Sequence, residues 1–186
     1  MFSVLLIGIS LSMDAFAVTV TNAVTLRPFR TRDMLWSAVY FGGFQFLMPL
    51  LGALLAGTIS SHMIRFGPFI SFGLLGYIGV KMILDAVKTD SDQDAPAGEL
   101  THSRLFALAV ATSIDAMAVG VSFAFSPPDP GIWLSCALIG CATFLLTLAA
   151  AALGKRVRIR KPQRAGIIGG VVLLALGIKL LLEGIL

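Results

Sequence analysis

Charged residues and cysteines are both scarce in this chain, and each scarcity excludes some classes of protein. Only 13% of the 186 residues are charged, 57% are hydrophobic and the mean hydropathy is +0.92, whereas soluble domains carry about a quarter charged residues. The two cysteines, Cys136 and Cys141, lie in one apolar run. They are too few for a disulfide framework or a thiolate metal site. The composition predicts a membrane protein without a separate soluble domain.

Apolar runs long enough to cross a bilayer recur six times, and short polar or charged gaps separate them. The first run has no basic start, carries Asp14 in its interior and is too long for a signal peptide. We therefore expect an all-α membrane protein that retains its first helix. Its six transmembrane helices are predicted at about residues 2–24, 34–57, 66–87, 103–125, 132–153 and 165–185.

Basic residues fall almost entirely on one side of this predicted arrangement. Gaps one, three and five hold or border eleven lysines and arginines, gaps two and four hold only Arg65, and Lys81 and Lys179 lie within apolar runs. The positive-inside rule then places the odd gaps in the cytoplasm and both termini outside. Topology thus explains the net charge of +4, and we expect no nucleic-acid partner.

The sequence also repeats itself. SMDAFAV at 12–18 and SIDAMAV at 113–119 share five of seven residues, and GVKMILDAV at 79–87 matches GIKLLLEGI at 177–185. The second and fifth spans match more weakly, at three aligned pairs: Trp36 and Trp133, Gly43 and Gly140, Gly57 and Gly154.

Three spans per unit is an odd number, so the second copy must enter the membrane from the opposite side. We therefore predict two inverted three-helix repeats at 1–87 and 103–186, joined by an acidic cytoplasmic linker at 88–102. Inverted repeats are a common plan of transporters, which place the substrate site near the midplane and alternate its access.

Asp14 and Asp115 each lie at about the twelfth residue of a predicted span, near the bilayer centre. An ionised carboxylate there costs roughly 2.5 to 3.5 kcal/mol on insertion scales, so such residues usually face a bundle interior and mark ion pathways. The alternative is structural pairing with Lys81 and Lys179. Those lysines lie about two turns from their helix ends, close enough to reach the headgroups. We interpret the aspartates as functional and the lysines as anchors.

Other polar and small residues surround this region. Gln45 and Thr143 at mid-depth offer neutral oxygen ligands to a hard cation, although hydrogen bonding across helices is their commoner use. Pro49 should kink or break the second span. Alanines beside the aspartates, at 15, 17, 116 and 118, would let the two aspartate helices approach closely. The residues assigned to the pathway or to support of the site are Thr21, Ser122, Asn22, Ser12, Ser113, Lys81 and Asp85.

Two carboxylates at one site repel each other unless a cation lies between them, and a divalent metal would neutralise the pair. Mn²⁺, Mg²⁺ and Ca²⁺ favour carboxylate and carbonyl oxygens, whereas zinc and copper favour imidazole or thiolate. His62 and His102 lie in gaps, while Cys141 keeps a softer metal open. We predict a metal site at Asp14, Asp115, Gln45 and Thr143 without a resident cofactor. The same acids could carry protons as a counter-ion.

These residues resemble the manganese efflux pump family of bacteria. The resemblance is carried by SMDAFAV, SIDAMAV, FGGFQFLMPLLG at 41–52, GCAT at 140–143 and Lys81 followed by Asp85, and it covers essentially all 186 residues. It implies a transporter, not an enzyme, that exports Mn²⁺ from the cytoplasm across the inner membrane, with Asp14 and Asp115 as the functional acids. Some family members have a glutamate at the place of Gln45, which changes the number of acidic ligands.

The residues by themselves leave other functions open. One is an exporter of another divalent cation or small solute. A second is an intramembrane aspartyl protease, in which two acids share one proton, although its GxGD signature is missing here. A third is a scaffold protein, which would need no acids at the bilayer centre.

Overall fold

The computed structural model describes residues 2–26, 29–56, 60–88, 100–129, 131–156 and 162–185. Within these ranges the chain is all-α, as the composition predicts. The helices are α1 (Phe2–Thr25), α2 (Thr31–Leu55), α3 (Ser60–Lys88), α4 (His102–Thr112), α5 (Ile114–Phe125), α6 (Ile132–Arg156) and α7 (Pro162–Ile185).

Several helices have the length and composition of membrane spans. In the described part of the chain α1, α2 and α6 each qualify, and α4 with α5 make a fourth span if the bent pair is counted as one. α3 and α7 contain shorter apolar stretches at Pro68–Leu84 and Ile167–Lys179. Large apolar side chains cover the outside of the molecule, with Phe125 77% and Trp133 65% exposed. An outer surface of this kind suits lipid rather than water.

The fourth predicted span is not one helix. We expected a single helix over 103–125, but the chain bends by 44° between α4 and α5, with Ser113 at the break. Two adjacent hydroxyl residues account for it. The Thr112 side chain donates to the carbonyl oxygens of Leu108 and Ala109, and that of Ser113 donates to Ala109. Such bonds compete with the backbone hydrogen bonds of a helix.

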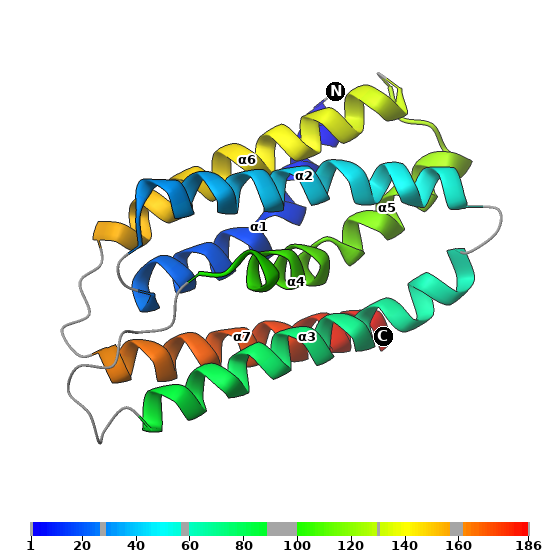
Figure 1. Ribbon diagram of the computed structural model, residues 1–186. Coiled ribbons are helices and arrows are strands. Elements are labelled where there is room, and N and C mark those ends of the chain that lie inside the picture. Colours follow the sequence, from blue (N-terminus) through cyan, green and yellow to red (C-terminus); the bar gives the residue numbers. More distant parts are fainter. Residues whose placement is uncertain are drawn as a thin grey trace.

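The helices form two groups (Figure 1). α3 and α7 lie side by side as a pair, here called the α3–α7 pair, and α1, α2, α4, α5 and α6 form the larger group. In the larger group α6 packs on both α1 and α2, and α5 packs on α2. The pair touches the larger group mainly where α7 meets α1 and α3 meets α4.

Backbones approach closely where α5 crosses α2. The carbonyl oxygen of Pro49 lies so near Gly120 that a Cβ atom there would overlap with it, and Gly52 is equally close to the carbonyl of Met117. Small residues permit this spacing between membrane helices. The crossing fixes α5, and with it Asp115, against the second span.

Two expectations about packing need correction. α2 is one continuous helix that contains Pro49, so Pro49 does not break the second span, and the kink there stays a prediction. The span that is broken is the fourth, at Ser113. The aspartate helices also do not pack along each other, because α1 lies mainly on α6 and α7 while α5 lies on α2. Ala15 and Ala116 are nevertheless buried, Ala15 in an apolar cluster that includes residues of α2, α3, α4 and α7, and Ala116 in one with residues of α1 and α6.

Candidate metal site between two aspartates

Asp14 lies in the middle of the continuous helix α1 and is 6% exposed. Its Oδ1 atom accepts a hydrogen bond of 3.2 Å from the ammonium group of Lys179, which reaches across from α7. The lysine side chain is half exposed. The ion pair compensates the charge of a carboxylate that is buried inside the protein.

Asp115 lies in the first turn of α5, immediately after the break. Its Oδ1 accepts a hydrogen bond of 2.9 Å from the backbone N–H of Ala116. The start of a helix also presents unpaired N–H groups and the positive end of the helix dipole, both of which stabilise a carboxylate. Backbone groups of its own helix therefore hold Asp115, whereas a side chain from another helix holds Asp14.

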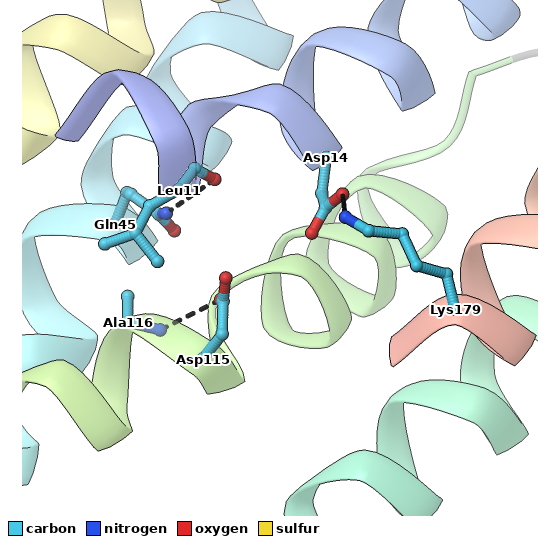
Figure 2. Close-up of polar contacts among 6 residues, drawn as sticks. All are labelled: Leu11, Asp14, Gln45, Asp115, Ala116 and Lys179. Carbon is cyan, nitrogen blue, oxygen red and sulfur yellow. Dashed lines mark hydrogen bonds and ion pairs between the residues drawn. The ribbon is translucent and has the colours of Figure 1, made fainter. Parts of the chain in front are cut away.

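The two carboxylates share one region of the molecule. Figure 2 shows Asp14 and Asp115 extending from α1 and α5 toward the same space, with Lys179 entering from α7. They are close enough to repel each other, and Lys179 attracts Asp115 as well as Asp14. The structure thus brings together the two acids that the repeat singled out, although each comes from a different half of the sequence.

Gln45 approaches from α2 and is 1% exposed. Its Nε2 group donates to the carbonyl oxygen of Leu11 at 3.1 Å, one turn before Asp14 on α1 (Figure 2). A carbonyl oxygen can only accept a hydrogen bond, so the NH₂ group of Gln45 must face Leu11. This leaves the amide oxygen of Gln45 to bind a cation.

Thr143 lies at the contact between α1 and α6. Its hydroxyl group is 2.7 Å from that of Ser12, and each of the two also bonds to a backbone carbonyl of its own helix. Packing of α1 on α6 accounts for both residues. Ser113 likewise bonds to the backbone of its own helix, at Ala109.

The remaining predicted pathway residues are spread along the helices. Thr21 is buried, whereas Ser122 is exposed and donates to the carbonyl of Ala118. Asn22 is fully buried and accepts a hydrogen bond of 3.2 Å from Arg104 of α4. Lys81 is exposed on α3, and the side chain of Asp85 lies outside the described residues.

Sequence reasoning missed two features of this region. The break before Asp115 was signalled by the adjacent hydroxyls of Thr112 and Ser113, since the matching positions of α1 are Leu11 and Ser12. The role of Ser71 had no signal, because its hydroxyl donates to the carbonyl of Ala111 from another helix. At the break the Ser113 side chain, the Ser113 N–H and the Ser71 side chain pair the carbonyls of Ala109, Val110 and Ala111 respectively.

No group of three or more histidine, cysteine, aspartate or glutamate side chains that could hold a metal ion is found in the described ranges. A cation between Asp14 and Asp115 would have two carboxylates, and neutral oxygens or water would have to complete its coordination. His102, at the start of α4, instead packs edge-on against Trp36. This donor chemistry fits a hard divalent cation such as Mn²⁺ better than zinc or copper.

Residues 28–181 match a family model described as "Putative manganese efflux pump". Relatives with the same description include those of Methanosarcina mazei, 46% identical over 96% of this chain and 94% of theirs, and Bifidobacterium adolescentis, 43% identical over 98% and 96%. A third, from Clostridium perfringens, is 39% identical over 97% and 93%. The chain belongs to the manganese efflux pump family. No solved structure matches it.

Membership of the manganese efflux pump family confirms the resemblance drawn from the doubled aspartate motif. It makes the protein a transporter and not an enzyme, so two acids at one site do not indicate a protease here. Apolar helices that could cross a membrane agree with a multi-pass membrane protein.

Proposed function

We propose that the protein exports Mn²⁺ from the cytoplasm by alternating access, through a midplane site built on Asp14 and Asp115. The observation that carries the proposal is the meeting of these two carboxylates, from the two halves of the sequence, beside one buried amide. Two carboxylates balance the charge of one divalent ion, so the site needs no resident cofactor. The description of the relatives as manganese efflux pumps supports both the ion and its direction.

Six spans in two inverted repeats, 1–87 and 103–186, are the architecture that we propose for this transport. Contacts between α2 and α6 support it because they are reciprocal: Gly42 packs against Phe144, and Gly140 packs against Phe46. A two-fold axis between the halves would produce such a pair of contacts. It would also relate Gln45 to Thr143, and it would align Gly140 with Gly42 rather than with Gly43 as the sequence match suggests.

Helix directions agree with the same architecture. Gly8 of α1 lies against Ile139 of α6, and Gly154, near the end of α6, lies against Ala23 near the end of α1, so these two helices run parallel. The predicted first and fifth spans would run parallel in an inverted repeat. With the positive-inside count, this supports a cytoplasmic acidic linker at 88–102 and both termini outside the inner membrane.

Alternating access requires two bodies that move relative to each other. The α3–α7 pair and the larger group meet over a smaller interface than the helices within each group share. The two aspartates belong to the larger group, while Lys179 belongs to the pair. We propose that the pair moves relative to the larger group around the site, with protons as a candidate counter-ion.

Export is tested in manganese-sensitive cells that produce the wild-type protein, Asp14→Asn or Asp115→Asn across a manganese series, with intracellular metal measured. Each variant should lose protection, since an amide cannot balance the charge of the ion. Asp33→Asn is the matched control: Asp33 accepts the backbone N–H of Arg30 at the start of α2, and an asparagine can do the same. Protection retained by either site variant would disprove the essential pair.

Selectivity is tested by repeating the series with Zn²⁺, Cd²⁺ and Mg²⁺. The oxygen ligands predict protection against manganese and little against zinc or cadmium. Equal protection against all of them would instead favour a general divalent cation exporter.

A further inference from the structure

The ion pair between Lys179 and Asp14 joins the two helix groups at the proposed site. The lysine was expected to anchor α7 at the headgroups, with pairing to an aspartate as the alternative, and its Nζ atom lies 3.2 Å from Oδ1 of Asp14. α7 packs mainly on α3, and α1 mainly on α6. The contact therefore crosses the boundary between the α3–α7 pair and the larger group, and does not stabilise either group internally.

The ammonium group of Lys179 also competes with a transported ion for the negative charge of the Asp14 carboxylate. Asp14 and Asp115 repel each other, and Lys179 attracts both. A divalent cation between the two carboxylates would be repelled by an ammonium in contact with one of them. Low dielectric and lack of counterions make this repulsion stronger in a membrane than in water. The ion and Lys179 cannot both bind Asp14 closely without a large cost.

We propose that Lys179 is a built-in competitor of the transported cation. Its ammonium group holds Asp14 until a divalent ion displaces it, and it returns to Asp14 when the ion leaves. It lowers the affinity of the site for the ion and speeds release of the ion. It also balances the charge of Asp14 while the metal-free carrier changes the side of the membrane to which the site is open. The inference rests on the proposed function, because it gives Lys179 a role in that same transport cycle.

Displacement of the lysine would also loosen the contact between the groups. α7 also meets α1 where Gly169 packs against Thr21 and Thr25, about two turns or more along α1 from Asp14. Leu173 of α7 shares a buried apolar cluster with Ala15 and Val18. A cation that takes Asp14 from Lys179 removes the ion pair from this contact. Metal binding and movement of the α3–α7 pair are thereby coupled.

The test uses the purified full-length protein, with Mn²⁺ binding measured by calorimetry and Mn²⁺ transport measured in proteoliposomes. Lys179→Met should bind Mn²⁺ roughly three- to tenfold more tightly, the range expected for loss of one partly exposed ion pair. Its maximal transport rate should fall, because release slows and the returning carrier has an uncompensated acid. Lys179→Arg keeps the charge and should restore affinity to within about twofold of wild type.

Lys155→Met is the matched control, because Lys155 is an exposed lysine in the last turn of α6 and its ammonium group lies over the ring of Phe29. It should change neither affinity nor rate. If Lys179→Met does not fold, Lys179→Gln provides a second neutral side chain with the same expectation. A purely structural lysine would lower stability without tightening Mn²⁺ binding.

The outcomes separate the two proposals. Unchanged or weaker Mn²⁺ binding by a folded neutral variant at position 179 overturns the competitor role, while wild-type transport and its loss in Asp14→Asn leave the proposed function standing. Failure of the wild-type protein to bind or transport Mn²⁺ overturns both.

Discussion

The two copies of the aspartate motif have nearly the same sequence but different backbones. In the first copy α1 runs unbroken through Ser12 and Asp14, whereas in the second copy the chain bends by 44° between Thr112 and Asp115. Just before the motif, Ser10 and Leu11 of the first copy correspond to Ala111 and Thr112 of the second. The hydroxyl of Thr112, which donates to the carbonyls of Leu108 and Ala109, accompanies the change from a continuous helix to a broken one.

This difference decides how each carboxylate is stabilised. Asp14, within a continuous helix, has no free N–H groups of its own helix nearby and is held by Lys179 of α7. Asp115 is at the start of a helix and is held by the N–H of Ala116. Asp14 is stabilised by a side chain of another helix, which can move away, whereas Asp115 is stabilised by the backbone of its own helix, which moves with it. A repeat in sequence therefore need not give two equivalent halves of a site.

The largest expected effect tests the crossing that fixes α5 to α2. Gly120→Val places a branched side chain against the carbonyl oxygen of Pro49, which another helix backbone supplies and which cannot rotate away. We expect a destabilisation of about 3 kcal/mol or more, at the upper end for overpacked sites. The thermal stability of the purified protein in detergent, followed by size-exclusion chromatography, measures it. A variant as stable as wild type would show that α5 does not lie this close to α2.

The sequence predicts those features of the fold and the site that depend on local interactions, and it misses those that depend on packing between distant helices. Apolar runs predict the all-α class and most helix positions, because burial in lipid and backbone hydrogen bonding act along one segment. The repeated motif likewise identifies Asp14 and Asp115. The contact between Lys179 and Asp14 depends on how α7 packs beside α1, and no local pattern encodes that packing. The break in the fourth span was missed because hydropathy does not register two hydroxyls within an apolar run.

An intermediate effect tests the origin of the break itself. Thr112→Val with Ser113→Ala removes both side-chain donors, leaving the carbonyl of Ala109 without the hydroxyls that now bond to it. Each hydroxyl donor removed should cost about 1 kcal/mol, so the double variant should cost about 2 kcal/mol. The transport rate should also fall, because α4 and α5 gain a preference for one continuous helix. Thermal stability and proteoliposome transport are measured on the same preparation.

Ser12→Ala is the matched control for the break, since Ser12 also donates to a carbonyl four residues earlier, that of Gly8, but lies in a continuous helix. It also loses the contact with Thr143. We expect a similar cost per bond and no change in backbone. If Ser12→Ala slows transport as much as the double variant, the break is not what distinguishes the second copy.

The smallest effect is expected at the position of α1 that aligns with Gly120. Thr19 occupies that position and is fully buried, and its hydroxyl has no hydrogen-bond partner among the described residues. Thr19→Val keeps the shape of the side chain and removes a polar group that is costly to bury unpaired. The variant should be as stable as wild type or more stable, by up to about 1 kcal/mol.

The contrast with Gly120→Val is informative because both variants place valine at matching positions of the two copies. α1 has room for a branched side chain at this position, and α5 does not, because α5 alone crosses a neighbouring backbone there. Thermal stability measured side by side should therefore give changes of opposite sign. Destabilisation by Thr19→Val would mean that its hydroxyl has a partner, and that α1 is held at this point by a polar contact rather than by packing.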